Sequence, residues 1–524
     1  MQATLIARDP TPDANGNPTT QDYTIDLVLP GRGKQPREAV KQVPASEWAQ
    51  GTFDAGAQGE AAQAESESSI FYRPHSLPSL SPHGSGEPNE FATFVQGREV
   101  WLGNAELREK VEDDFRSAAE RVDQTEGFLL TTPLTSGSSG LSPLVLELLR
   151  DEFAGGTGGK STVWVTGLCE DAEGWARGDS ERSASHRLLN TFLSLPTLED
   201  LSSLLLPIQP CYAYSPTDPR ESGWTRYFNP SLSSPERYAA MRTVREMALN
   251  GAGEELRVPG AMGEIVELLS WRGNKVASLS GVAPVETAEF FEGKGEEGVR
   301  RLRESWKDFS VLRPEALTAE GVKPRPRATP FAQYSILRGL TFEENQALGP
   351  LLEKSVEPLR EPWSKWVTTE QPYPILPSTP PIFAGLLPTG RPLTLPIPTL
   401  TDPQTSGGLF GLPDPRFPPP SSYTVQPASI PILTTLSTRP DARYFFRSLL
   451  EGVRELRRTR AGVLREYEAG EFGVGVEGIE EARERLETLF DNYGGEEEGE
   501  EDKDEDENWD ATEPKDEFDF DLEE

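Results

Sequence analysis

Apolar and polar positions between residues 122 and 153 follow a strand, loop and helix order. The run Phe128–Thr131 predicts a buried strand, and the apolar spacing of Leu141–Phe153 predicts an amphipathic helix. The loop between them carries six small or polar residues, which are Thr135, Ser136, Gly137, Ser138, Ser139 and Gly140. Such a loop presents backbone N–H groups at a helix N-terminus, where an anion is stabilised. The alternative is an ordinary turn between a strand and a helix, with a serine as the cap.

The same alternation continues along the chain and predicts an α/β fold. Ser161–Leu168 and Phe331–Leu340 are expected to be strands, and Pro235–Leu249 is expected to be a helix. Glu286–Arg313 predicts a charged outer helix, and Tyr444–Arg460 predicts a surface helix. The apolar stripe of this last helix consists of Phe445, Leu449, Val453 and Leu456, and its basic flank consists of Arg454, Arg457, Arg458 and Arg460.

Shifts in composition divide the chain into four expected regions. They are an irregular N-terminus (1–37), an α/β domain (38–325), a second α/β domain (326–492) and a disordered acidic tail (493–524). The boundary near residue 325 follows from the proline-rich stretch 323–330, which predicts an extended linker. Within the second domain, 17 prolines between residues 372 and 431 predict a long insertion packed on the surface.

The chain has 524 residues and a formal net charge of −35 at pH 7. The tail contributes strongly, because 18 acidic and 2 basic residues lie between Glu496 and Glu524. So acidic a chain repels phosphate backbones, which disfavours direct binding to nucleic acid. The tail is too polar to bury the surface that folding requires. Its Trp509, Phe518 and Phe520 are typical of a docking peptide for a basic groove, and a purely solvating tail is the alternative.

Cysteine and histidine are scarce, with two cysteines and three histidines in the whole chain. This usage excludes a disulfide framework and a structural zinc site. Cys169 and His186 are the candidate catalytic pair, but no third residue near them in the sequence is suited to orient the histidine. No run of eighteen apolar residues predicts a membrane span, and the first ten residues lack the features of a secretory or mitochondrial presequence.

The stretch Ala154–Ser161 fits a loosened form of the Walker A motif. A phosphate-binding loop of that kind leaves a strand and enters a helix. This stretch leaves the predicted helix Leu141–Phe153 and enters the predicted strand Ser161–Leu168, which is the reverse order. We therefore expect a helix C-cap and a connector here.

Residues Val111–Phe128 resemble the helix and strand that lead into the phosphate-binding loop of tubulin. Further segments resemble, in the same order, the Misato family of tubulin-like proteins, which is involved in mitochondrial distribution and mitochondrial DNA inheritance. These segments are Val40–Trp48, Phe71–Leu77, Phe91–Trp101, Leu148–Phe153 and Ser161–Leu168. The resemblance implies a tubulin/FtsZ-like nucleotide-binding fold.

The resemblance also implies a nucleotide site that is incomplete. It makes Thr135–Gly140 a vestigial phosphate loop, because side chains stand where tubulin has a nearly continuous glycine run. It places Asn190 toward the ribose, with a helix cap as the alternative. The family's opening glycine loop has no counterpart in 1–37, where Tyr23–Leu29 is the expected strand, so we expect this end to be truncated or rebuilt. In the loop Asn250–Glu255, Glu254 matches the family's catalytic acid poorly.

We therefore expect a non-enzymatic tubulin-like protein that supports mitochondrial organisation, partitioning and DNA inheritance through protein contacts. We expect no catalytic residue, metal ligand or resident cofactor, and GTP is the cofactor that the alternative requires. The expected partners are proteins, tubulin-related proteins or chaperonin among them, at the cytosolic face of mitochondria and in the cytoplasm. Two alternatives stay open. One is a GTP-binding switch or weak GTPase, and the other is an acidic chaperone for basic clients.

Overall fold

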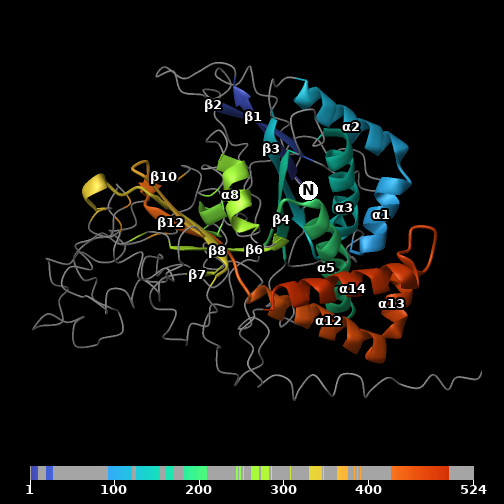
Figure 1. Cartoon of the computed structure of the whole chain (residues 1–524). Helices are drawn as coiled ribbons and strands as arrows, with labels where there is room; N and C mark the ends of the chain where they lie inside the picture. Colours follow the sequence, from blue (N-terminus) through green and yellow to red (C-terminus); the bar gives the residue numbers. More distant parts are fainter. Residues whose placement is uncertain are drawn as a thin grey trace, which may run out of the picture.

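A computed structural model describes residues 2–9, 19–26, 92–120, 125–153, 161–169, 181–208, 261–270, 273–282, 330–344, 363–375 and 427–494, with short pieces near 247, 285, 307, 346 and 386. Two sheets lie on either side of the helix α8 (Ala261–Leu269), and further helices cover the outer face of the first sheet (Figure 1). This arrangement of helices and strands is the predicted α/β class.

The first sheet has the strand order β2-β1-β3-β4-β5. Its strands are β1 (Gln2–Asp9), β2 (Thr19–Asp26), β3 (Thr125–Pro133), β4 (Thr162–Leu168) and β5 (Leu204–Ile208). β3, β4 and β5 are parallel, and their apolar residues are buried, as expected when both faces of a sheet are covered. The predicted strand over Ser161–Leu168 is confirmed, and β3 contains the predicted Phe128–Thr131.

The N-terminal strands β1 and β2 form an antiparallel hairpin, and β1 also pairs antiparallel with β3. The prediction of an irregular N-terminus over 1–37 was therefore wrong for these residues. The expected strand Tyr23–Leu29 lies earlier, at Thr19–Asp26. The second strand contains three threonines, Tyr23 and Ile25, and the first contains Thr4 and Ile6; these residue types favour extended backbone. Because β1 runs against β3, its carboxyl end lies at the opposite edge of the sheet from the carboxyl end of β3.

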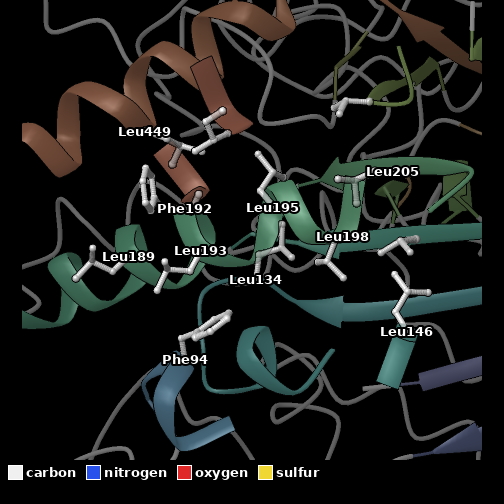
Figure 2. Packing of buried hydrophobic residues seen from close by; sticks show 14 of the residues in the cluster. Phe94, Leu134, Leu146, Leu189, Phe192, Leu193, Leu195, Leu198, Leu205 and Leu449 are labelled. Carbon is white, nitrogen blue, oxygen red and sulfur yellow. The ribbon is translucent and has the colours of Figure 1, made fainter. Parts of the chain in front are cut away.

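Helices pack on the outer face of the first sheet. They are α1 (Phe94–Leu102), α2 (Ala105–Ala119), α3 (Ser138–Leu148), which a π-helical turn continues to Phe153, and α5 (Glu181–Leu201). The predicted helix over Leu141–Phe153 is confirmed and begins three residues earlier. Figure 2 shows Phe94 and Leu134 lying toward the stretch of α5 that carries Leu193. The core of this layer therefore joins α1, the end of β3 and α5.

The second sheet has the order β7-β6-β12-β8-β9. Its strands are β6 (Ala277–Val282), β7 (Lys307–Asp308), β8 (Ala332–Arg338), β9 (Ser364–Thr369) and β12 (Ile432–Thr438), and a two-stranded ribbon joins β10 (Tyr373–Pro374) to β11 (Ser429–Ile430). The strand predicted over Phe331–Leu340 is β8. Since β6 precedes residue 325 and β12 follows it, the predicted boundary there does not separate the two sheets.

The C-terminal helices α12 (Ala442–Thr459), α13 (Ala461–Glu468) and α14 (Gly475–Asn492) pack beside α5, far along the sequence from it (Figure 1). The predicted helix Tyr444–Arg460 is confirmed, and its apolar stripe is buried. Its basic flank is engaged by neighbouring carboxylates: Arg457 pairs with Glu480 of α14, and Arg458 pairs with Glu455. The helices after residue 442 therefore complete the layer that covers the first sheet.

Several predictions concern residues outside the described ranges. They are most of the helix 286–313, most of the insertion 372–431, the loop 250–255 apart from Ala252, the connector 154–160, Cys211 and the tail from residue 495 onward. On either side of the Walker-like stretch the order is as predicted, since a helical turn ends at Phe153 and a strand begins at Thr162. None of the helices in the described ranges has the length and apolar character needed to cross a lipid bilayer.

Candidate functional site

The candidate phosphate loop, residues 135–140, lies at the carboxyl end of β3 and turns directly into α3. Ser139 N–H donates to Ser136 O at 2.9 Å and Gly140 N–H donates to Gly137 O at 3.1 Å, so the tight turn itself uses two backbone donors. Gly137 is the N-cap of α3, and no side chain caps this helix end. Five of the six loop residues are buried, and Ser138 is partly buried.

Helix α1 lies directly on this loop. A Cβ atom on Gly97 would stand 1.9 Å from Gly137 O, and a Cβ atom on Gly140 would stand 1.9 Å from Phe94 O. Real Cβ atoms do not approach backbone oxygen so closely, so hydrogen is the one side chain that fits at either position. The backbone of α1 therefore lies next to the N-terminal end of α3, which is where an anion would bind.

Two hydroxyl groups of the loop nevertheless lack hydrogen-bond partners. Thr135 Oγ1 and Ser139 Oγ are buried and have no partner among the described residues. A buried hydroxyl without a partner carries a desolvation cost of about 1–3 kcal/mol. Both hydroxyls stand at the N-terminal end of α3, where the helix dipole favours negative charge. The loop thus retains two features of an anion site although it is covered.

Asn190 is fully buried in the middle of α5, so its interpretation as a helix cap was wrong. Its Oδ1 accepts from Phe94 N–H at 2.8 Å, and its Nδ2 donates to Ala92 O at 2.7 Å and to Thr135 O at 3.0 Å. Tyr467 OH donates to the same Oδ1 at 2.9 Å. An amide group makes about four such bonds, so Asn190 has no capacity left for a ribose hydroxyl.

Tyr467, which the sequence analysis did not single out, extends this network to α13. Its phenolic oxygen lies 3.0 Å from His186 Nδ1, and the two rings stack. The phenolic oxygen therefore contacts the side chains of both Asn190 and His186. Burial lowers the pKa of His186, against the opposing effect of Glu466. Burial and then Glu466 raise the pKa of Tyr467 far above its ordinary value.

The direction of β1 bears on how the nucleotide site could be completed. Gln2 pairs with Thr131, so the amino end of β1 lies beside the carboxyl end of β3. A phosphate loop that followed β1 would begin after Asp9, at the other edge of the sheet. The carboxyl end of β1 therefore lies away from residues 135–140, whereas the carboxyl end of β2 lies at the same edge of the sheet as that of β3.

Other candidate sites carry no chemistry in the described residues. Within the described ranges, no group of three or more His, Cys, Asp and Glu is arranged to hold a metal ion. Cys169 is buried at the end of β4, while the Nδ1 atom of His186 is bonded to Tyr467. The geometry of the described residues therefore gives no support to a catalytic pairing of Cys169 with His186.

A separate cleft of about 280 Å³ lies between α1, α3, α5 and the start of α14. Its floor includes Phe94, Leu144 and Val474. Both arginines in it are engaged: Arg98 Nε donates to Phe472 O at 3.3 Å, and an Arg485 nitrogen lies 2.8 Å from Glu481 Oε1. Of these two arginines, Arg485 is paired with a carboxylate and Arg98 is held by a backbone oxygen.

Comparison with known protein families defines the class of protein. Residues 65–234 match the model of a family described as a tubulin domain, and this region includes every element from α1 to β5. The parallel strands, the loop before α3 and the helices around it therefore form a tubulin-like domain.

The similar proteins found by comparison are tubulin-like proteins of one name. Protein misato homolog 1 from Homo sapiens and from Pongo pygmaeus are each 26% identical to this chain over 258 residues. The mouse protein of the same name, from Mus musculus, is 32% identical over 126 residues, which is 24% of this chain and 21% of its own length. Over the matched residues the chain is therefore similar to the Misato family of tubulin-like proteins. The longer matches span 49% of this chain and 41% of the relatives' length.

Proposed function

We propose that this chain is a non-enzymatic tubulin-like protein that supports mitochondrial organisation, partitioning and mitochondrial DNA inheritance through contacts with other proteins. It acts at the cytosolic face of mitochondria and in the cytoplasm, with tubulin-related proteins or chaperonin among its partners. The support for the mitochondrial role is the resemblance to the Misato family. The support for a role without nucleotide chemistry is the packing at the candidate phosphate loop.

The observation that carries this proposal is the complete use of Asn190 by the protein itself. The residue that the tubulin resemblance assigns to the ribose holds together α1, the loop and α13 instead. Nucleotide could reach the loop only if α1 moved away and several buried hydrogen bonds broke. Each of those bonds contributes about 1 kcal/mol, so their combined loss opposes binding.

The direct test is titration of the full chain with GTP and magnesium by calorimetry. We expect no binding up to millimolar nucleotide, because α1 occupies the approach to the loop. Ser139→Ala supplies a control, since it removes a hydroxyl that has no partner and is expected to leave the fold intact. Micromolar binding by the unmodified chain that Ser139→Ala weakens would overturn the proposal.

A second test places the protein in its own cells. Depletion is expected to alter the distribution of mitochondria, and both the unmodified chain and Ser139→Ala are expected to restore it. The proposal would be wrong in its mitochondrial part if depletion left mitochondria and their DNA unchanged. It would be wrong in its nucleotide part if the unmodified chain restored the distribution and Ser139→Ala did not.

A GTP-binding switch is the second candidate function, and one observation favours it. Thr135 Oγ1 and Ser139 Oγ are buried without partners at the start of α3, which is where phosphate oxygens would accept hydrogen bonds. The calorimetric titration separates this candidate from the first one. The switch predicts saturable binding and loss of affinity in Ser139→Ala.

A further inference from the structure

We propose that Tyr467 and Phe472 hold α1 closed over the loop 135–140, so that the docking of α13 decides whether the loop is covered. We call the contacts of Tyr467 with Asn190, and of Phe472 with Arg98, the α1 clasp. This inference rests on the proposed function, because it explains how the loop is kept closed to ligands.

The first half of the α1 clasp passes through Asn190. Tyr467 OH donates to Asn190 Oδ1 at 2.9 Å, and Asn190 in turn contacts the backbone on both sides of the closed junction. It bonds to Ala92 and Phe94 at the start of α1 and to Thr135 in the loop. One side chain of α13 therefore supports the residue that joins α1 to the loop.

The second half of the α1 clasp is direct and lies further along α1. Arg98 Nε donates to the backbone oxygen of Phe472, in the turn after α13, at 3.3 Å. Val474 N–H donates to Tyr467 O at 2.8 Å, which fixes this turn against the end of α13. Both halves of the α1 clasp therefore come from one short segment of the chain.

The segment that consists of α13 and the turn up to Gly475 can move as one unit, because few of its residues are buried. α13 has eight residues, and Leu464 and Tyr467 are the two that are buried. The turn after it lies between Gly470 (φ 93°) and Gly475 (φ 74°), both in the left-handed region that glycine adopts at low cost. A Cβ atom added to either glycine would meet no other atom within 4 Å, so neither is packed closely. A short helix with few buried residues and glycines after it opens more easily than the helices beneath it.

Displacement of this segment would release α1 and leave the loop accessible. The groups then reached by solvent are the N-terminal end of α3 and the hydroxyls of Thr135 and Ser139, which lack partners in the closed form. An oxyanion is the ligand that such a site takes. The α1 clasp is therefore an autoinhibitory contact between the C-terminal helices and an anion-binding loop.

The test compares two single hydroxyl deletions by hydrogen exchange of the full chain. Tyr467→Phe removes the bond to Asn190. Tyr493→Phe is the matched control, because its hydroxyl is also buried but joins the end of α14 to the backbone of Val276, just before β6. The reporters are the hydrogen-bonded amides of Phe94, Gly97, Ser139 and Gly140.

We expect Tyr467→Phe to speed exchange at these four amides roughly tenfold, since it removes one buried hydrogen bond. Tyr493→Phe is expected to leave them within about twofold of the unmodified chain. Equal acceleration of the four amides in both variants would overturn the proposal, because it would indicate general loosening of the fold. No acceleration in either variant would overturn it as well.

A second pair keeps the test decisive if Tyr467→Phe does not fold. Arg98→Met removes the contact with Phe472 at the surface, and Arg116→Met removes an exposed arginine of α2 that pairs only within its own helix among the described residues. Faster exchange at Gly97 in Arg98→Met but not in Arg116→Met supports the α1 clasp, and equal rates oppose it. These readouts do not involve nucleotide. GTP binding by the unmodified chain would therefore refute the proposed function while the exchange comparison still decides on the α1 clasp.

Discussion

Among their contacts with the rest of the molecule, the C-terminal helices make two through buried tyrosine hydroxyls. At one, Tyr467 OH contacts the side chains of Asn190 and His186. At the other, Tyr493 OH accepts from Val276 N–H at 2.7 Å and donates to Val276 O at 3.1 Å. Tyr467 bonds to side chains that have other partners, whereas Tyr493 bonds to the backbone of a single residue.

The junction at Tyr467 can therefore respond to changes in the groups around it, whereas the junction at Tyr493 fixes the position of a helix. The backbone at Val276 does not titrate. Val276 is bridged to Leu205 of β5 and precedes β6, so Tyr493 ties the end of α14 to the point where the two sheets meet. His186 titrates, and Asn190 distributes its bonds over three other segments. Substitutions at Tyr467 should therefore alter the packing of α1 against the loop 135–140. Substitutions at Tyr493 should alter only the packing of α14 near Val276.

The largest effect is expected from Asn190→Ala. The substitution removes four hydrogen bonds and leaves Phe94 N–H, Ala92 O and Thr135 O buried without this partner. We expect the free energy of unfolding to fall by about 4 kcal/mol. The measurement is the urea midpoint followed by circular dichroism. A loss below about 1 kcal/mol would mean that the junction is not held by Asn190.

A smaller but still large effect is expected from Gly97→Ala. The added Cβ would meet Gly137 O, so α1 has to move away from the loop, and we expect a loss of about 3 kcal/mol. Gly263→Ala in α8 is the matched control, because nothing lies within 4 Å of its added Cβ. Alanine is the better helix former, so this control should gain about 0.5–1 kcal/mol. Effects of the same sign in both variants would contradict the close packing of α1.

The next effect in size is expected from Tyr493→Phe. The variant loses both bonds to Val276, and we expect a decrease of about 2 kcal/mol in the free energy of unfolding. Combining it with Tyr467→Phe tests whether the two junctions are independent. We expect the two losses to add within about 0.5 kcal/mol, measured by urea unfolding of the single and double variants. A strong departure from additivity would show that the junctions act together.

The smallest effect is a dependence on pH that arises from His186. Its pKa is lowered from the ordinary value of 6.5 by burial, with Glu466 opposing and Arg182 reinforcing the shift. The unfolded chain therefore binds the proton more readily, and this contribution to stability is lost as the pH falls below 6.5. His186→Gln removes the titration, so the difference between its urea midpoint and that of the unmodified chain should change between pH 8 and pH 5.5. A constant difference would exclude His186 as the responding group.

The sequence was sufficient for the elements that bury continuous apolar runs. β4, β8 and the helix after the candidate loop were predicted because their periodicity is strong and local. The loop 135–140 was also located, since its residues are adjacent in the chain. Of the N-terminal hairpin, the sequence indicated one strand, Tyr23–Leu29, which overlaps β2, and it did not indicate β1, whose residues Gln2–Asp9 contain few β-branched side chains.

The network at Asn190 could not be predicted, because Tyr467 lies 277 residues away in the sequence. One local signal was present. Asn190 stands between Leu189 and Phe192 in a helix whose neighbouring positions are all buried, and a polar residue there needs partners inside the protein. That reasoning would have favoured a structural amide over a ribose contact, although it would not have identified Tyr467.

The position of β12 in the second sheet determines the order in which the chain can be assembled during synthesis. β12 lies between β6 and β8 and pairs with both. About 150 residues separate β6 from β12, so a ribosome needs on the order of ten seconds to make the strand that β6 requires. During that time the backbone N–H and C=O groups of β6 that pair with β12 have no partner from that strand. A nascent chain of this design needs protection from wrong pairings until translation has passed Thr438.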